Sequence, residues 1–550
     1  MSTEENVPLS SDEENSSNNV TLERVIEECG SFGRYQYMHF FFLILFPVAT
    51  GVYNFYYVFA SAETSYQCIT PYNISQGFSL AISPSQCSYE IKNVQNQTMG
   101  IFPCTNWIYN PTIYGRTFTE EGNFICQYSF YHSLLATTLQ IGAMFTFFTG
   151  RLTDWIGRRC SLRLLVGQLL VTSLITQGLL QFVPMSTNHK FILVLISQFS
   201  AGIDTYIASF ILILELTTSS HAAFTGNLAL VAYSVGEVIV TGMAYICQHW
   251  LLLKWAMTLY MLALVPYLIF VPESPHWLLT KHRYAELKQV LHQMAQTNRR
   301  SDSRWLIYYQ YLIDNHRKQK YLNQKNKVKL SFLSKSRRFL THVPTMSKLF
   351  ISGFLGFVTL LLYFKVSFGL GTMKEINLYL NMIIGAIVEA IGYIASSLLM
   401  IRYGRKPIFI VFLILTIIYL LLTPLASHLN HTIIIIVAQL GKFAISGAVG
   451  VTYIFVPELF PTTIRATGMG FFALLSRFGS SVAPIIDTSI SRNTSFVTYI
   501  NYIYALLTII CVLLTLLLPE TRNIPLTDKI NYNSNRNEKA PSKTQSITRT

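Results

Sequence analysis

Six ionisable side chains fall inside long apolar stretches of the sequence, where a charge is costly. They are Asp204, Glu237, Lys365, Glu389, Lys442 and Arg477. A charged side chain at the centre of a membrane-spanning helix costs about 2.5–3.5 kcal/mol, and such residues are functional candidates by default. Their carboxylates can hold a cationic group, and their ammonium and guanidinium groups can hold an anionic one. The sequence therefore predicts a buried site for a small charged solute.

Arg477 lies near the middle of its apolar stretch and is the most informative of these charges. A guanidinium can hold a carboxylate through two parallel hydrogen bonds and is a poor neighbour for a bare cation. The alternative role is structural, as the ion-pair partner of Glu389 or Asp487. Quaternary ammonium groups bind over aromatic faces, and four tyrosines lie in these stretches: Tyr206, Tyr233, Tyr363 and Tyr393. Because 14% of the chain is aromatic, each ring could instead serve helix packing.

Helices that cross a membrane must position these charges. Of the 550 residues, 51% are hydrophobic and 12% are charged, which is too little charge to cover a soluble protein of this length. A helix of about twenty apolar residues spans the hydrocarbon core. We predict twelve spans, at 37–59, 129–149, 161–183, 191–215, 223–248, 253–271, 347–368, 377–401, 407–426, 432–456, 467–488 and 497–518. The first run has no small-residue cleavage pattern after it, so we expect it to stay as a span and not to be removed as a signal peptide.

Three pairs of landmarks recur along the chain at nearly one spacing. Gly157-Arg158-Arg159 and Pro272-Glu273-Ser274 are matched 247 positions later by Gly404-Arg405-Lys406 and Pro519-Glu520-Thr521, and Glu215 is matched 243 positions later by Glu458. This repeat predicts two equivalent six-helix halves in the same orientation, at 37–271 and 347–518. Parallel halves of this kind belong to transporters, in which the halves rock about a site near the middle of the membrane.

Positive charge is concentrated in the loop between the two halves. The net charge is +14, but the loop 272–346 is strongly basic, whereas 60–128 contains only Lys92 and Arg116 as basic residues. Lysine and arginine mark cytoplasmic loops, so we predict that 272–346, the N-terminal segment 1–36 and the tail 519–550 face the cytoplasm of a plasma membrane. The charge thus indicates contact with the lipid bilayer and not with nucleic acid. Recognition of anionic lipid by the basic loop is an alternative use of the same charge.

The predicted outer loop 60–128 has the signature of an exported module. Four of the eight cysteines lie in it, Cys68, Cys87, Cys104 and Cys126, and they predict two disulfides with three possible pairings. The same loop contains the glycosylation sequons at Asn73 and Asn96. Disulfides and sequons in one loop agree with the charge-based topology.

Several motifs resemble those of a known transporter group. Gly150-Arg151-Leu152-Thr153-Asp154-Trp155-Ile156-Gly157-Arg158-Arg159 resembles the loop signature of the major facilitator superfamily. Pro272-Glu273-Ser274-Pro275, Pro457-Glu458-Leu459-Phe460-Pro461 and Gly33-Arg34-Tyr35-Gln36, with the long Cys-rich loop, are similar to the organic cation/anion/zwitterion transporter family. The resemblance runs from about residue 22 to 525. It implies the major facilitator fold and a central cavity that binds organic cations, anions or zwitterions such as carnitine.

The resemblance also separates the substrate branches. The cation branch carries aspartate at the position of Arg477, whereas the anion and carnitine-type branches carry arginine. The anion branch tends to have lysine at the position of Tyr393. Glu389 and Arg477 in one cavity would therefore suit a zwitterion. Glu237 stands where the family usually has a neutral residue; it could accept a proton and couple transport to pH, neutralise Lys442, or bind a cationic group.

The resemblance and the topology place a set of charges where the two halves approach on the cytoplasmic side. They are Arg151, Asp154, Arg158, Arg159, Glu215, Glu273, Arg405, Glu458, Arg465 and Glu520. Ion pairs at a wet surface are individually modest, which suits a gate that must form and break. The alternative is that they are static helix-end anchors. The sequence departs from the family at His221, His276 and Ile401, which weakens the expected charge network.

Other functions fit the sequence less well. A preference for organic cations would require Arg477 to be turned away from the cavity or paired. A sugar transporter shares the Gly-Arg-Arg and Pro-Glu-Ser-Pro motifs but usually lacks the Cys-rich loop, and a sensor that no longer transports is a further alternative. No metal-ligand spacing, nucleophile elbow or phosphate loop is seen in any polar segment, so we expect no enzyme activity, metal or cofactor. The expected partners are an organic ion and a coupling ion, sodium or a proton.

Overall fold

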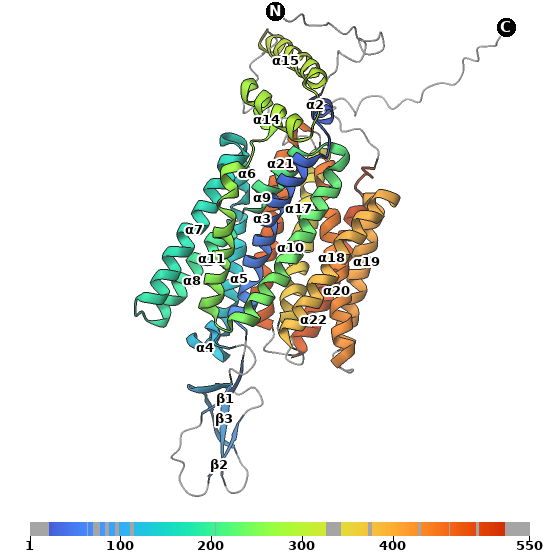
Figure 1. Ribbon diagram of the computed structural model, residues 1–550. Coiled ribbons are helices and arrows are strands. Elements are labelled where there is room, and N and C mark those ends of the chain that lie inside the picture. The colour runs from blue at the N-terminus through green and yellow to red at the C-terminus, as the bar shows by residue number, and fades with distance from the viewer. Residues whose placement is uncertain are drawn as a thin grey trace, which may run out of the picture.

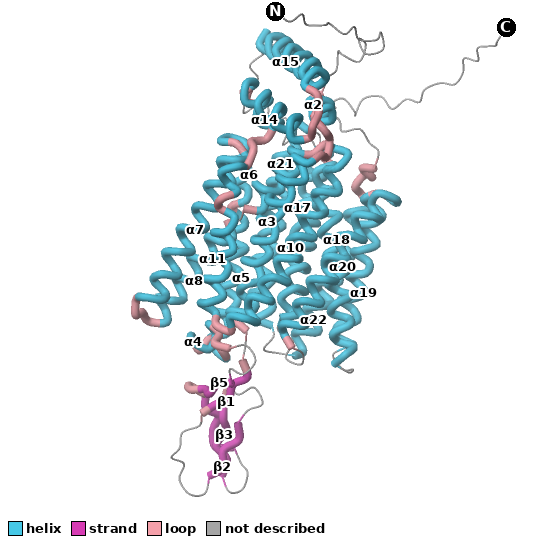
Figure 2. Tube along the Cα trace, in the orientation of Figure 1, coloured by secondary structure: helices cyan, strands magenta, loops and turns pink. Residues whose placement is uncertain are grey.

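A computed structural model describes residues 21–62, 64–69, 78–82, 87–93, 98–110, 115–203, 205–325, 343–371, 377–426, 431–460, 462–490 and 494–522. In this part of the chain, twelve helical segments are long and apolar enough to cross a membrane. Each coincides with one of the predicted spans, which confirms the all-α class. The protein is a multi-pass membrane protein (Figures 1 and 2).

The first half contributes six spans. They are α3 (Arg34–Ala60), α5 (Ser129–Met144) with α6 (Thr146–Ile156), α7 (Arg158–Phe182), α8 (Thr187–Gly202) with α9 (Tyr206–Leu216), α10 (Ser219–Cys247), and α11 (Trp250–Leu264) with α12 (Tyr267–Phe270). The second span extends to residue 156, seven residues past its predicted end at 149. The helix continues through the polar Gly150–Ile156 segment until Gly157, whose φ of +100° ends it.

The second half contributes the other six spans. They are α17 (Val343–Gly371), α18 (Leu378–Tyr403), α19 (Arg405–Ala426), α20 (His431–Glu458), α21 (Thr462–Ile490) and α22 (Thr494–Leu516). The break between α18 and α19 repeats the break between α6 and α7, because Gly404 has a φ of +101°. The two halves thus share both the order of their helices and the backbone at this turn.

The interface between the halves has the symmetry of the repeat. Across the interface α5 packs against α21, and α10 packs against α18. These are spans two and eleven, and spans five and eight. Shifting each span by six positions converts one contact into the other, as expected for two equivalent halves related by a twofold axis. Any side chain on the inner faces of α5, α10, α18 and α21 is therefore placed between the halves.

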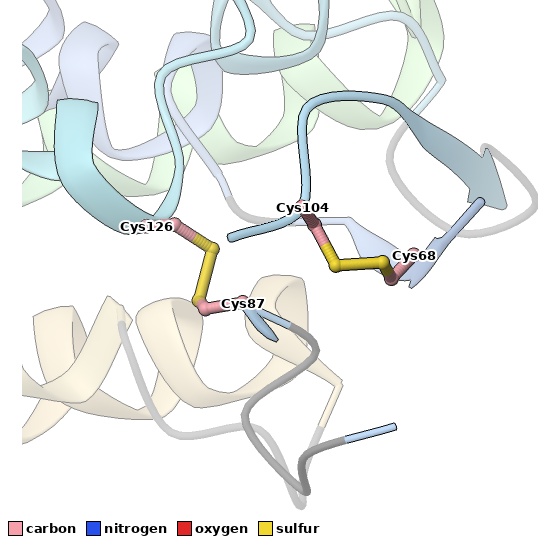
Figure 3. The surroundings of a disulfide bond; sticks show 4 residues. All are labelled: Cys68, Cys87, Cys104 and Cys126. Atoms are coloured by element: carbon pink, nitrogen blue, oxygen red, sulfur yellow. A yellow bond between two sulfur atoms is a disulfide. The ribbon is translucent and has the colours of Figure 1, made fainter. Parts of the chain in front are cut away.

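A small β module projects from one end of the bundle, called here the strand end (Figure 2). It contains the antiparallel pair β1 (Ser65–Cys68) with β5 (Trp107–Asn110), and a sheet in the order β2 (Phe78–Ile82), β3 (Ser88–Asn93) and β4 (Thr98–Pro103). Disulfides join Cys68 to Cys104 and Cys87 to Cys126, selecting one of the three possible pairings (Figure 3). The sequons at Asn73 and Asn96 lie outside the described residues, so glycosylation stays a prediction.

Helices outside the spans cover the opposite end of the bundle: α2 (Leu22–Glu28), α13 (Pro275–Thr280), α14 (Tyr284–Thr297) and α15 (Asp302–Lys325). A further short helix, α4 (Phe118–Gly122), lies at the strand end. Asn298 ties this layer to the first span. Its side chain accepts a hydrogen bond from Tyr35 N at 2.9 Å and donates to Cys29 O at 2.9 Å and to Gln36 Oε1 at 3.0 Å.

Candidate substrate-binding site

Three buried charges from both halves meet at the middle of the interface. Lys442 Nζ on α20 lies 2.6 Å from Glu389 Oε2 on α18 and 3.6 Å from Glu237 Oε2 on α10. All three side chains are 0% exposed. We call Glu237, Glu389 and Lys442 the central triad. It contains two carboxylates and one ammonium, so it has an excess negative charge when all three groups are ionised.

The members of the triad differ in how well they are satisfied. Glu389 Oε1 accepts hydrogen bonds from Tyr363 OH at 2.9 Å and from Ser234 Oγ at 3.3 Å. Lys442 Nζ donates to Ser367 Oγ at 2.6 Å and lies 4.9 Å from the centre of the Tyr363 ring. Neither carboxylate oxygen of Glu237 accepts a hydrogen bond from the described residues. Glu237 is thus the group whose charge is least compensated.

Glycines let two helices of the triad approach a neighbouring helix closely, α10 against α3 and α18 against α20. A Cβ added at Gly236, next to Glu237, would lie 2.2 Å from Val48 O of α3. A Cβ added at Gly392, three residues after Glu389, would lie 2.8 Å from Phe443 O of α20. Both distances are far below van der Waals contact, so only glycine lets these backbones approach so closely.

Arg477, on α21 of the second half, reaches the first half across the interface. Its Nη1 donates to Gln140 Oε1 of α5 at 3.5 Å, and Ser480 Oγ donates to the same oxygen at 2.9 Å. Tyr233 on α10 is within electrostatic reach of Glu237, Glu389 and Arg477. The negative triad and the guanidinium therefore flank one tyrosine at the interface.

The other candidate residues lie in different surroundings. Tyr393 is 2% exposed and lies close to Glu389, whereas Tyr206 is 6% exposed and stacks on Phe210 with 5.4 Å between ring centres. Lys365 Nζ is 3.0 Å from Asp487 Oδ1, away from the triad, and 5.2 Å from the centre of the Tyr504 ring. Asp487 is thus paired with Lys365, and no ion pair between Asp487 and Arg477 is found among the described residues. Asp204 lies outside them.

Two kinds of site residue were missed by the sequence analysis. Gln140 is 0% exposed and bridges Arg477 to α3, since its Nε2 donates to Asn54 Oδ1 at 3.4 Å. The sequence signal that could have identified Gln140 is that two amide side chains, Gln140 and Asn54, lie within apolar runs. Lys254 is 4% exposed and donates to Ser197 Oγ at 2.6 Å. It was overlooked because it lies at the very start of its predicted span.

The opposite end contains two equivalent charge clusters, one in each half. In the first, Arg158 Nε and Nη2 donate to the two oxygens of Glu215, each at 2.9 Å, and Nη2 lies 3.0 Å from Asp154 Oδ1. Glu273 Oε1 accepts from the backbone nitrogens of Arg158 at 2.8 Å and Arg159 at 3.2 Å. Glu273 therefore caps the first turn of α7, where the helix dipole favours a negative charge.

The second cluster repeats this arrangement. Arg405 donates to both oxygens of Glu458 at 3.1 Å, and Glu520 accepts from the backbone nitrogens of Arg405 and Lys406 at 3.0 Å. Burial opposes ionisation of Glu520, but four backbone N–H donors outweigh it and hold its pKa below the ordinary value. Burial lowers the pKa of His276, which lies near Glu215 of the first cluster.

The contacts within these clusters do not cross between the halves, as a gate that holds the halves together would require. Each of these ion pairs joins residues of one half, and Glu273 and Glu520 anchor helix ends, as the alternative interpretation expected. Arg151 is exposed, and the side chain of Arg465 lies outside the described residues. A role of this layer in gating stays a prediction.

Side-chain contacts cross the interface towards both ends of the central region. At the strand end, Tyr57 packs against Phe368 with 4.6 Å between ring centres, and Phe59 stacks on Tyr379 at 5.8 Å. Towards the opposite end, Asn227 Nδ2 donates to Ser397 Oγ at 2.8 Å. Because the triad is also fully buried, this conformation keeps the central charges away from solvent.

Two parallel six-helix halves with charged groups enclosed between them define a transporter of the major facilitator type. Residues 50–531 match the family model described as "Sugar (and other) transporter", and the chain belongs to that family. It is a membrane transporter and not an enzyme.

Its relatives are distant but similar over nearly their whole length. The chain is 26% identical to the organic cation transporter protein of Drosophila melanogaster, over 94% of this chain and 96% of that protein. It is 26% identical to solute carrier family 22 member 4 of Mus musculus, over 92% and 94%, and 24% identical to organic cation/carnitine transporter 2 of Homo sapiens, over 91% and 92%.

A solved structure supports the fold. The proton:xylose symporter XylE, bound to 6-bromo-6-deoxy-D-glucose, matches with a TM-score of 0.61 at 15% identity, over 90% of this chain and 98% of that chain. At this identity the match concerns the fold alone.

Proposed function

We propose that this transporter carries small organic ions by alternating access and prefers solutes with both a cationic and a carboxylate group, such as carnitine, or organic anions. The observation that carries the proposal is that Arg477 and both carboxylates of the central triad lie within electrostatic reach of Tyr233. Arg477 can hold a carboxylate bidentately. The excess negative charge of the triad, with aromatic rings beside it, can hold an ammonium group.

The overall charge supports a zwitterion in particular. Two carboxylates of the triad are balanced by Lys442 and Arg477 together, so the four groups sum to zero charge. A net-neutral solute with separated charges can engage both poles without leaving a buried charge uncompensated, which is the costly outcome in an apolar region. The relatives, which include an organic cation transporter and an organic cation/carnitine transporter, are compatible with the same class of solute.

A preference for organic cations is the second candidate. It is favoured by the contact of Arg477 with Gln140, because a guanidinium engaged by α5 is less available to a solute. In that case the triad alone would select the solute. We further propose that the β module faces the extracellular side of the plasma membrane, with both termini in the cytoplasm, and that transport is coupled to sodium or to protons.

Uptake by cells that express the protein tests the proposal. Labelled carnitine, glutarate and tetraethylammonium would be compared in the wild type, Arg477→Gln and Arg477→Lys, with Arg283→Gln as a control that removes an exposed arginine. We expect Arg477→Gln to lose uptake of carnitine and glutarate, and Arg477→Lys to recover only part because an ammonium lacks the planar fork.

Three other outcomes would change the assignment. Tetraethylammonium uptake that is strong and insensitive to both Arg477 variants would favour the cation transporter. Loss of all uptake in Arg283→Gln would mean that the arginine effect is not specific. No uptake of any probe by protein that reaches the cell surface would contradict the proposed solute class and favour a sensor.

A further inference from the structure

Glu237 is a buried carboxylate whose charge is poorly compensated by its surroundings. It is 0% exposed, lies at the interface of the halves, and neither oxygen accepts a hydrogen bond from the described residues. Its closest charged neighbour, Lys442, is already engaged by Glu389 at 2.6 Å and by Ser367. A buried carboxylate without hydrogen bonds or a partner of its own is unstable in its charged form.

The surroundings determine which carboxylate of the triad takes a proton. Glu389 accepts hydrogen bonds from Tyr363 and Ser234 and forms the short ion pair with Lys442, and all three contacts favour its charged form. Glu237 has only the contact of 3.6 Å with Lys442. One proton on the triad therefore resides on Glu237, and it removes the excess negative charge.

Apart from Lys442, no cationic side chain contacts Glu237 among the described residues. The titratable groups near it are Glu389 from α18, Lys442 from α20 and Tyr363 from α17, and Tyr393 of α18 lies beside Glu389. Arg477 of α21 reaches the same region through Tyr233 of α10 itself. Helix α3 presents the ring of Phe55, and Tyr53 and Tyr56 of α3 point their hydroxyls to the backbone of α11. From α9, Tyr206 lies near Tyr393.

We propose that Glu237 carries a proton in the solute-free transporter and releases it to water when the cationic group of a solute reaches the triad, so that solute and proton are exchanged. The solute cation then supplies the positive charge that the proton supplied before. When the solute leaves on the other side, Glu237 takes a proton from that compartment. One proton thus moves against each cationic group, and no other reactant is needed.

The position of Glu237 links this exchange to movement of the halves. Glu237 belongs to α10 of the first half, whereas Lys442 and Glu389 belong to the second. Their contact therefore crosses the interface on which alternating access depends. A charged Glu237 attracts Lys442 across it, and a protonated Glu237 does not. The exchange rests on the proposed function, since it requires a solute with a cationic group, but the proton on Glu237 does not.

The proton can be observed directly in the purified full-length protein without any solute. Infrared difference spectra between the wild type and Glu237→Gln at neutral pH are expected to contain the carbonyl band of a protonated carboxylic acid. Glu286→Gln, which removes an exposed carboxylate, serves as the control and leaves this band unchanged. If Glu237→Gln does not fold, Glu237→Asp retains a titrating group and shifts the band. Absence of the band overturns the proposal.

The exchange is then tested with tetraethylammonium as the probe. Its binding is expected to remove the carboxylic acid band, and its affinity for the wild type is expected to rise about tenfold per pH unit while Glu237 holds its proton. In Glu237→Gln the affinity is expected to be independent of pH. A band that persists with bound probe, or a pH-independent wild type, overturns the exchange. Transport of probes without proton movement in sealed vesicles would refute the exchange and leave the proposed function standing. Failure of all transport would refute the proposed function and the exchange that rests on it, but not the proton on Glu237.

Discussion

Removal of the Lys442 ammonium gives the sharpest test of the central triad. In Lys442→Met, Glu389 and Glu237 lose a partner at 2.6 and 3.6 Å, and all three groups are fully buried. At an effective dielectric constant of about 20, the contact with Glu389 corresponds to an attraction of about 6 kcal/mol. A protonated Glu237 adds no ion-pair attraction to it. The desolvation of each ion offsets much of this, so the net loss expected from breaking a buried pair is about 3–5 kcal/mol.

The double variant Lys442→Met/Glu389→Gln distinguishes the loss of one ion pair from two independent losses of stability. It removes one positive and one negative charge together, so a single carboxylate, Glu237, remains and keeps its proton. We expect the double variant to recover more than half of the stability lost in Lys442→Met. The partly exposed pair of Lys365 and Asp487 is the matched comparison, and removing its lysine should cost only about 0–1 kcal/mol.

The measurement is thermal unfolding of the purified proteins in detergent, monitored by size-exclusion chromatography. The single variants and the double variant would be ranked by their thermal stability at one pH and one salt concentration. If the loss in Lys442→Met/Glu389→Gln equals the sum of the two single losses, the two side chains act independently. That result would refute the ion pair and, with it, the excess charge assigned to Glu237.

Three further predictions concern the opposite end of the bundle, and all use the purified protein. Gly157→Ala should lower the melting temperature, because its φ is +100° and the new Cβ would lie 2.4 Å from Glu273, a cost of about 1–2 kcal/mol; Gly150→Ala, with nothing within 4 Å, should not, and equal losses would contradict the argument. Because the pKa of Glu520 is lowered from 4.5, its stabilisation is present above that value and lost as the pH falls through the lowered pKa; the melting profiles of the wild type and Glu520→Gln should converge below pH 4.5, and a constant gap would count against this. Asn298→Ala should speed hydrogen exchange across α2, since it deletes the hydrogen bonds that hold the segment before α3; unchanged exchange would show that other contacts hold it.

Local sequence patterns were sufficient to predict the twelve spanning helices. Each of the twelve apolar runs forms a spanning helix because backbone groups in a bilayer must be paired within the helix itself. The repeat of Gly157 and Gly404 was equally informative, since both glycines adopt the same positive φ at equivalent turns. The end of the second span was predicted too early, because the polar residues after 149 still favour helix although they are not apolar.

The sequence also identified most charges of the site, because a charge within an apolar run is conspicuous on its own. It left open which groups are partners. Four cysteines allowed three pairings, and the fold selected Cys68 with Cys104 and Cys87 with Cys126. The neighbour of Glu237 was equally open, and the crossing of α10 and α20 places it 3.6 Å from an ammonium that Glu389 also holds.

The charge clusters at the end opposite the strands show the same division. Their residues followed from the repeat, but their partners did not, since a pair within one half and a pair across the interface have equally plausible sequence spacing. The structure places Arg158 with Glu215 and Arg405 with Glu458, each inside its own half. Apolar periodicity determines a helix from its own residues alone. An ion pair between helices depends on where two distant segments cross, and that crossing is determined by packing of the whole bundle.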